Sequence, residues 1–579
     1  MNVSLKTVTV AAFLLFPACL HAQQAGQESV SRGISVVPTP EEEQREDKTR
    51  DEFDRSPVLP PGNLPWQSDQ LSGVSGVHVS SIKLPNNTIL SAQQIAEVTA
   101  PYTNRVVSTE ELSELRHKLS MLYFDLGFVN SGVILPDQKV SDGTVEFTEV
   151  MGTLTDVQLE GNHVLNDNYW LSRINSVTSG PLQINELQST LQIIEQHPLV
   201  QRIEAQLVPG LAAGESSLHL NVFETSPWRL IIGADNHRSP SLGGEQLTLY
   251  LAHLSLTGHG DVVEIYANLA DGLGDGGLAY TLPLGSRGSA IKGWFSGGDA
   301  EIVEYPFKQI NIQSKTYNLG AEFSYPLMKA ANYAWLGLLG VEAKHSESTL
   351  LDTPFSFSLG EIEGEADTTA LVLGTEWTHR SQQQVFAFRM TFHFGTDWWN
   401  AEVNPVVPPG LNGPSTDFIT TQGQFQYVRR LNWQDSELHI RSAFQLSSDP
   451  LLPVEKMPVG GVNSVRGYRE NLLVRDNGLV ASAEWRLPLF QNRSPAENFD
   501  WRALTVAAFT DFGMSWDQDS GLPSDAKEKI YSIGLGLTWS PLPGLTAQVY
   551  RGEALQDVIG SGDDLQDDGW HWRLSYQVF

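Results

Sequence analysis

From residue 227 to residue 579, the chain consists of short segments in which apolar and polar side chains alternate with a period of two. Such alternation places successive side chains on opposite faces of a β-strand. Residues 531–539, 438–446 and 570–578 follow the pattern, and turns rich in Gly, Asp, Asn and Pro separate the segments. In residues 385–395 one face carries only large apolar side chains, namely Phe386, Phe388, Met390, Phe392 and Phe394. The other face carries small, polar or charged side chains, namely Ala387, Arg389, Thr391 and His393. This pattern predicts a sheet with one continuous apolar face.

A soluble β-sandwich also alternates, so the distribution of aromatic residues distinguishes the two folds. Twelve of the fifteen Trp residues lie beyond residue 290, often at segment ends, as the aromatic girdles of a membrane barrel require. A sheet that faces lipid must close, because an open edge leaves backbone groups unpaired. At about 22 residues per strand and connection, 353 residues predict an antiparallel transmembrane β-barrel of around 16 strands. The chain is therefore predicted to be mainly β.

The N-terminal residues 1–22 have the features of a signal peptide. Lys6 supplies the positive charge, residues 8–20 are apolar, and Ala22 is a small residue at the expected cleavage point. A buried N-terminal helix is the alternative, and a lipid-attachment motif at Cys19 fits poorly with the preceding Phe and Pro. Export together with a barrel predicts the outer membrane of a Gram-negative bacterium.

The composition excludes several classes of function. The 68 acidic and 37 basic residues give a formal charge of −31, which argues against nucleic acid as a partner. Cys19 is the single cysteine, so disulfides and thiolate metal sites are excluded. Neither a serine-hydrolase elbow, a zinc-protease motif nor a phosphate loop is present, and His237 and His571 are interpreted as lumen or surface residues. We expect no enzymatic activity, no cofactor and no metal site.

Four further segments precede the barrel. Residues 23–56 contain a stretch, 41–55, with twelve charges in fifteen positions, which is either a solvated helix or a disordered tail. Residues 57–75 form a Pro-rich linker. Residues 76–151 and 152–226 each show a strand, two helices and two strands, and the first has a helix-capping box at Ser108–Glu111. Two such βααββ units in tandem are an internal repeat and favour binding modules over an active site.

Residues 122–147 resemble the signature of a POTRA domain in the two-partner secretion transporters of the ShlB/FhaC/HecB type. That family's pattern is a Gly-aromatic-Val turn, then Leu-Pro-x-Gln, then Asp-Gly. The residues that match it are Gly127, Phe128, Val129, Leu135, Pro136, Gln138, Asp142 and Gly143. In residues 152–226, the LEGNHV and LVPG segments are similar to the second POTRA domain.

The most specific resemblance lies in residues 457–489. There Val465, Arg466, Gly467 and Tyr468 match the family's inward-folded loop motif. Asp511 and Gly513, in an FTDFG segment, match the barrel-wall motif that holds this loop. The resemblance implies an Arg466–Asp511 ion pair in the lumen. A bidentate arginine–carboxylate pair is directional and strong when shielded from water, and so suits a pore-loop latch; the alternative is an ordinary stabilising ion pair.

The resemblance covers nearly the whole mature chain and implies the function. The POTRA domains would bind the N-terminal secretion domain of an unfolded exoprotein of the haemolysin or adhesin kind, by β-augmentation. The barrel would then secrete it, with residues 23–56 as a plug helix that leaves the pore. Alternatives are POTRA units that only support the barrel, an assembly factor of the same superfamily that inserts other barrels, and a passive porin.

The C-terminus departs from the family pattern. The family ends with an aromatic residue in phase with the outward face of the last strand, but Phe579 is one residue out of register with Trp570 to Val578. The partners expected during biogenesis are the barrel assembly machinery, for which Phe579 is the signal, and the lipids and lipopolysaccharide of the outer membrane.

Overall fold

The computed structural model describes residues 76–579 apart from 141, 405, 491–498, 520, 522–526 and 557–561. The described residues form two compact units, one ending at Thr225 and the other beginning at Ser226. The predicted signal peptide, the charged segment 23–56 and the linker 57–75 lie outside the described residues. No helix within the described ranges is long and apolar enough to cross a membrane.

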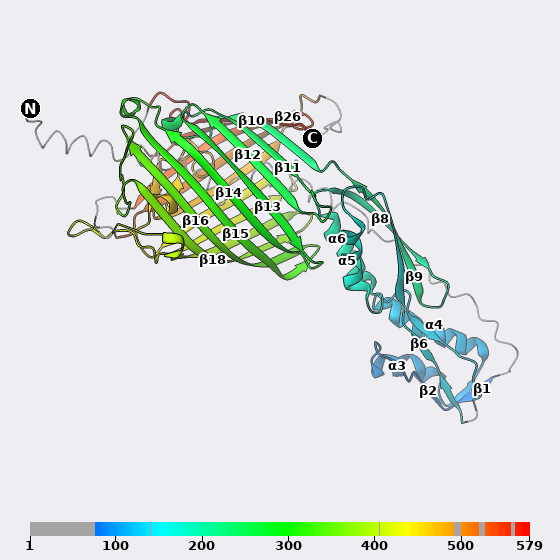
Figure 1. Ribbon diagram of the computed structural model, residues 1–579. Helices are drawn as coiled ribbons and strands as arrows, with labels where there is room; N and C mark the ends of the chain where they lie inside the picture. The colour runs from blue at the N-terminus through cyan, green and yellow to red at the C-terminus, as the bar shows by residue number, and fades with distance from the viewer. Residues whose placement is uncertain are drawn as a thin grey trace, which may run out of the picture. The chain divides into compact units, whose positions relative to one another are not determined.

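The first unit begins with a small α/β module whose helices cover three two-stranded sheets (Figure 1). Its pairs are β1 with β3 and β4 with β6, both antiparallel, and β2 with β5, parallel. The core contains Leu115, Leu119, Tyr123 and Phe147, all fully buried. The elements are β1 (Val77–Val79), β2 (Ser81–Lys83), α3 (Ala92–Thr99), β3 (Arg105–Val107), α4 (Thr109–Asp125), β4 (Gly132–Ile134), β5 (Thr144–Glu146) and β6 (Thr148–Val150).

Helix α4 begins where the capping box was predicted. The Ser108 hydroxyl accepts the Glu111 N–H at 3.2 Å, and the Glu111 carboxylate accepts the Ser108 N–H at 2.8 Å. The bond from the Ser108 N–H to the Glu111 carboxylate, together with a bond from Arg105, holds the pKa of Glu111 below its ordinary value. Residues 144–150 do not form one continuous strand. The chain is broken at Phe147, whose N–H donates to the Lys83 carbonyl at 2.9 Å, so that β5 and β6 join different partners.

The second module has the expected strand–helix–helix–strand–strand order, whereas the first departs from it because β3 lies between its two helices. It consists of β7 (Thr153–Glu160), α5 (Asp167–Thr178), α6 (Ile184–Glu195), β8 (Val200–Pro209) and β9 (Glu215–Glu224). The strand order is β7-β9-β8, and the two helices pack through the fully buried Trp170, Ile174, Leu187 and Leu191. Direct hydrogen bonds join the two modules: the Asn130 amide donates to the Gly214 carbonyl at 3.0 Å, and the Ile184 N–H donates to the Gly127 carbonyl at 2.9 Å.

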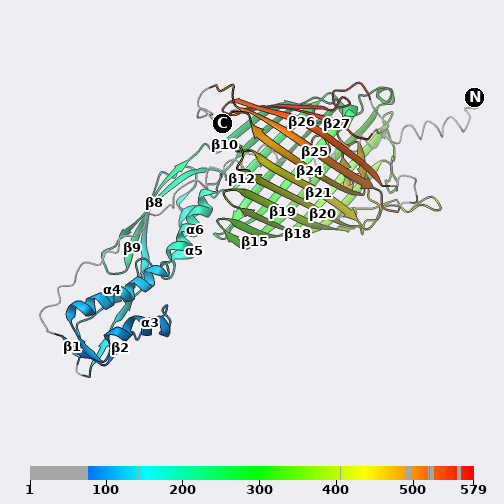
Figure 2. The same cartoon turned by 180° about the vertical axis from the view of Figure 1, so that it is seen from behind.

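The second unit is a closed antiparallel barrel, seen from its two sides in Figures 1 and 2. Its sixteen strands confirm the prediction; the two-residue β17 (Thr353–Pro354) only extends one of the loops. The strands are β10 (Trp228–Asp235), β11 (Gln246–His253), β12 (Val262–Ala270), β13 (Leu273–Leu284), β14 (Ser289–Glu301), β15 (Ile312–Ala330), β16 (Tyr333–Leu350), β18 (Glu365–Arg380), β19 (Gln384–Thr396), β20 (Ile419–Arg430), β21 (Glu437–Ser447), β24 (Asn477–Pro488), β25 (Leu504–Trp516), β26 (Glu528–Leu542), β27 (Leu545–Ala554) and β28 (Trp570–Gln577).

The two faces of the barrel wall follow the alternation in the sequence. On β26, Ile533 and Leu535 are 50% and 69% exposed, whereas Ser532 between Tyr531 and Ile533 is fully buried. On β19, Thr391 and His393 are buried on the inner face. The apolar side chains therefore point outward, where lipid replaces water as their surroundings.

The barrel closes where its first strand meets its last. β10 pairs with β28 over five register positions, from Ile231 with Gln577 to Asp235 with Arg573, whereas β10 pairs with β11 over eight. We call this β10–β28 junction the seam. Its backbone ladder is shorter than that between β10 and its other neighbour.

Candidate functional site

Residues 448–476, between β21 and β24, fold into the interior of the barrel, and we call them the inward loop. Two short strands, β22 (Met457–Val459) and β23 (Leu473–Arg475), pair within it. Its apolar side chains are buried against the inner face of the wall, in a cluster of Ala443, Met457, Val459, Val465, Tyr468, Leu473, Val480 and Ile530. The predicted motif residues Val465 to Tyr468 thus lie at the buried tip of this loop.

Arg466 joins the inward loop to two strands of the wall. Its guanidinium donates to both oxygens of Asp511 on β25, each at 2.8 Å, and its backbone N–H donates to the same carboxylate at 3.0 Å. On β24, it also pairs with Glu484 and donates to the Ser482 hydroxyl at 3.0 Å. The structure therefore brings Arg466 and Asp511 together, and it adds Glu484, which the motif did not indicate.

This ion pair lies in a buried cluster of charged side chains. Arg466, Asp511 and Glu484 are 6%, 2% and 3% exposed. The Arg466 guanidinium carbon lies 3.6 Å from the centroid of the Phe509 ring, a cation–π distance. Arg486 donates to Glu484 at 2.6 Å, and the buried Arg441 adds a further positive charge near Glu484. Removing Arg466 would take away the guanidinium that pairs with the buried Asp511, which is far more costly than losing a surface pair.

Gly467 and Tyr468 fix the tip to the last three strands. The Gly467 N–H donates to His571 Nε2 on β28 at 3.2 Å, and the Tyr468 hydroxyl donates to the Tyr531 carbonyl at 3.0 Å. Gly467 has φ of +91°, and its backbone lies directly against Gly552 on β27. His571, which the sequence indicated only as a lumen or surface residue, is thus a partner of the loop. Gly513 on β25 lies under Val465, with no room for a side chain between them.

The contact between Gly467 and Gly552 gives a direct test of loop seating. A Cβ atom at Gly552 would lie 2.6 Å from the Gly467 nitrogen, a distance that requires the tip to move. Gly552→Ala is therefore expected to displace the tip and to increase the time spent in high-conductance states in planar lipid bilayers by about tenfold, which corresponds to about 1.4 kcal/mol of lost contact. Gly274→Ala is the control, because its Cβ would meet only Leu269 at 3.8 Å. Equal conductance in both variants would contradict a close fit at the tip.

A second attachment holds the stem of the inward loop to a different part of the wall. Glu455, in η6 (Pro453–Glu455), accepts from Lys344 Nζ on β16 at 3.0 Å and from the Thr368 hydroxyl on β18 at 2.6 Å. All three side chains are buried. Nothing in the sequence indicated this contact, because it joins residues more than 80 positions apart with no shared motif.

Arg469 provides a third attachment, beside the tip. It pairs with Asp567 in the β27–β28 loop and donates to Glu304 in the β14–β15 loop at 2.9 Å. Its neighbour Glu470 accepts the Val462 N–H at 2.6 Å and so closes the tip on itself. The inward loop is therefore held at its stem, at its tip and on the side of the tip.

The residues of the predicted client-binding motif all lie in the first α/β module, where most of them shape turns. The Gly127 carbonyl accepts the Ile184 N–H at 2.9 Å, and the Gly143 carbonyl accepts the Ser80 N–H at 2.7 Å. Asp142 accepts the Thr144 N–H at 3.1 Å, which lowers the pKa of its carboxyl group. Phe128 and Leu135 pack against the core, while Val129 lies in the turn between them and Pro136 follows β4.

Gln138 is the most informative residue of this motif. Its amide donates to the Glu146 carbonyl at 2.7 Å and accepts the Glu146 N–H at 2.9 Å. A side-chain amide thus takes the two hydrogen bonds that a neighbouring strand would make to β5. The backbone N–H and carbonyl of Glu146 on β5 are therefore already used in hydrogen bonds to Gln138.

Phe579 lies two residues beyond the end of the last strand. β28 ends at Gln577, and Val578 and Phe579 are 40% and 49% exposed. The Val578 N–H donates to the Leu230 carbonyl at 2.8 Å, so the chain continues to pair with β10 up to its end.

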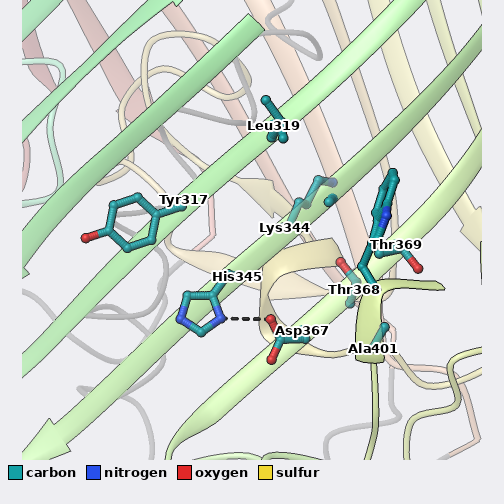
Figure 3. Close-up of a pocket in the computed structure, with 10 residues that line it drawn as sticks. Tyr317, Leu319, Lys344, His345, Asp367, Thr368, Thr369 and Ala401 are labelled. Carbon is teal, nitrogen blue, oxygen red and sulfur yellow. Dashed lines mark hydrogen bonds and ion pairs between the residues drawn. The ribbon is translucent and has the colours of Figure 1, made fainter. Parts of the chain in front are cut away.

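A small hollow lies on the barrel wall at β15, β16 and β18, near the loop that follows β19 (Figure 3). Its outward-facing residues include Leu319, which is 58% exposed, and His345, which bonds Asp367 at 2.8 Å. Lys344, next to His345 on the same strand, points to the opposite face and reaches Glu455. The hollow is therefore separated from the lumen by the wall itself. Among the described residues, no group of three or more His, Cys, Asp or Glu side chains is arranged to hold a metal ion.

Comparison with known proteins gives two family matches. Residues 214–539 match the model of the haemolysin secretion/activation protein ShlB/FhaC/HecB, and residues 77–151 match the ShlB-type POTRA domain. The heme/hemopexin transporter protein HuxB of Haemophilus influenzae (strain 86-028NP) is 22% identical over 504 residues, which cover 83% of this chain and 84% of HuxB. The hemolysin transporter protein HpmB of Proteus mirabilis is 21% identical and covers 73% of both chains. The solved structure of CdiB from Escherichia coli has the same fold, with a TM-score of 0.66, 19% identity, and coverage of 92% of this chain and 97% of CdiB.

Proposed function

Because this chain belongs to the ShlB/FhaC/HecB family of haemolysin secretion/activation proteins, we propose that its α/β modules capture an unfolded exoprotein and that the inward loop controls passage through the barrel. The chain is a two-partner secretion transporter of the Gram-negative outer membrane and secretes a partner exoprotein. It is not an enzyme. The observation that carries the finer proposal is a buried loop held to the inner wall by Arg466, inside a barrel preceded by two α/β modules.

The domain organisation that we propose follows from the same argument. Residues 76–151 are POTRA 1, 152–226 are POTRA 2, and 227–579 are the barrel. A signal peptide at 1–22, a plug helix within 23–56 and a linker at 57–75 complete the proposal for the part of the chain that is not described. The barrel assembly machinery recognises the C-terminal strand with Phe579. Lipopolysaccharide and phospholipid surround the outward apolar face of the barrel.

For the client, we propose an exoprotein with an N-terminal secretion domain, of the haemolysin or adhesin kind. HuxB and HpmB are named as transporters of heme/hemopexin and hemolysin, which supports a large exported partner for this chain as well. The first POTRA signature, from Gly127 to Gly143, contacts the client, and the open edges of the sheets accept its backbone by β-augmentation. Because Gln138 already bonds the backbone of β5 at Glu146, the outer edges of β7 and β8 are better placed to pair with the backbone of the client.

The experiment that tests this function is export in a heterologous Gram-negative host. The transporter is expressed with the large exoprotein encoded beside it, and the exoprotein is measured in the medium by immunoblot. A photoreactive phenylalanine analogue at Asp156, on β7, is expected to cross-link to the client, and the same analogue at Asp435, in a turn of the barrel, is not. Export without the transporter would overturn the proposal. Absence of export in its presence would favour the assembly-factor or porin alternatives.

Folding of the client outside the cell is the driving force that we propose. A client variant that cannot fold externally is expected to stall in the barrel, where an antibody against its N-terminus detects it on the cell surface. Undiminished release of such a client into the medium would contradict this mechanism.

A further inference from the structure

One buried glutamine in the β27–β28 loop contacts both the inward loop and the β10–β11 loop. Gln566 is fully buried. Its side-chain oxygen accepts the N–H of Glu470, beside the tip of the inward loop, at 2.9 Å. Its side-chain nitrogen donates to the carbonyls of Asn236 and Arg238, in the β10–β11 loop, at 2.8 and 2.6 Å. The amide thus uses its acceptor and both of its donors in one place.

The residues on the other side of Gln566 continue the seam beyond its backbone ladder. The Asn236 side chain donates to the Trp570 carbonyl at 2.9 Å and accepts the Trp572 N–H at 2.7 Å. These bonds link the segment after β10 to the start of β28. Because the seam has only five register pairs, these side-chain bonds form a large share of its closure at this end.

We propose that Gln566 is a positioning residue that couples the seating of the inward loop to the closure of the seam. Seating of the loop beside Arg466 places the Glu470 N–H against Gln566, and this contact orients the amide so that its two N–H groups meet the carbonyls of Asn236 and Arg238. When the tip leaves, the amide loses the bond that orients it, and the seam loses reinforcement at this end. What this coupling means for transport rests on the proposed function, but the coupling itself does not.

The test uses an isosteric change that breaks only one side of the contact. In Gln566→Glu, one carboxylate oxygen still accepts the Glu470 N–H, while the other faces two carbonyl oxygens and donates nothing. The full-length protein is placed in lipid nanodiscs, and hydrogen–deuterium exchange is followed by mass spectrometry. Peptides from 462–471 report on the tip, peptides from 228–236 and 570–577 report on the seam, and β14 serves as the internal reference. Gln384→Glu is the charge-matched control, because Gln384 only accepts, from the Tyr427 hydroxyl at 3.0 Å.

Exchange in Gln566→Glu is expected to be about tenfold faster in both the seam and the tip, with β14 unchanged, as loss of buried hydrogen bonds implies. Faster exchange in the seam alone would overturn the coupling, because Gln566 would then stabilise only the seam. A uniform increase over the barrel, or no increase, would also overturn it.

A second variant tests the coupling from the other side and covers the case in which Gln566→Glu does not assemble. Coupling between two sites is reciprocal, so release of the tip by Arg466→Ala must also speed exchange in the seam. In the double variant Arg466→Ala/Gln566→Met, the seam is expected to exchange no faster than in Gln566→Met alone. Additive effects in the double variant would show that the tip and the seam open independently.

Discussion

Replacement of Arg466 by alanine is expected to reduce export of the partner exoprotein at least tenfold while leaving the barrel in the outer membrane. The variant leaves Asp511 and Glu484 buried without their shared arginine. Loss of one partner from a buried ion pair costs about 3–5 kcal/mol, which corresponds to a shift of about 10²- to 4 × 10³-fold in the population of the seated loop. A loop that is no longer seated cannot respond to the client, and export fails.

The measurement has three parts: exoprotein in the medium, the heat-modifiable mobility of the barrel on gels, and conductance in planar bilayers. Arg466→Lys keeps the charge but loses the bidentate geometry, and is expected to fall between the natural protein and Arg466→Ala. Arg430→Ala is the matched control, because its ion pair with Asp435 lies in an exposed turn, where the two side chains are 43% and 65% exposed. Equal export by Arg466→Ala and the natural protein would be consistent with the transport function but would show that the ion pair only stabilises the protein.

Replacement of Trp170 by alanine is expected to unfold the second α/β module and to abolish export, again with an inserted barrel. Trp170 is fully buried between the helices and the sheet, and truncation of a buried Trp to Ala costs about 3–5 kcal/mol. A module of about 70 residues has a small core, and a loss of this size approaches its whole stability. Because the barrel is a separate compact unit, its heat-modifiable mobility is expected to stay unchanged.

Limited proteolysis of the full-length protein measures this effect, because cleavage between residues 152 and 225 reports on unfolding of the module. Leu211→Ala is the control, since Leu211 lies in a loop of the same module and is fully exposed. Full export by a proteolytically sensitive Trp170→Ala protein would show that the second module is dispensable for secretion.

The sequence was most informative where one physical requirement repeats along the chain. Every wall strand must show apolar side chains to lipid at alternate positions, and Leu535 and Ser532 illustrate how directly exposure follows that pattern. The capping box at Ser108 and Glu111 was equally readable, because its hydrogen bonds join residues three apart. Local rules of this kind predicted the barrel, its number of strands and the start of α4.

Contacts between distant residues could be predicted only where a motif marked both partners. Arg466 and Asp511 carried such motifs, whereas Glu484, Lys344 and Glu455 did not. Their meeting depends on the register of strands and on the path of the inward loop, which no local pattern encodes. The break at Phe147 has the same origin, since its partner Lys83 belongs to a strand more than 60 residues away.

The attachment at Glu455 holds the stem of the inward loop at a fixed point on the barrel wall. Ten residues, 456–465, separate this fixed point from Arg466, and a chain of that length reaches at most about 33–36 Å when extended. If the tip leaves Asp511 as we propose, the attachment of Glu455 to β16 and β18 limits how far the tip can travel. The same attachment would keep the released tip within reach of its seat.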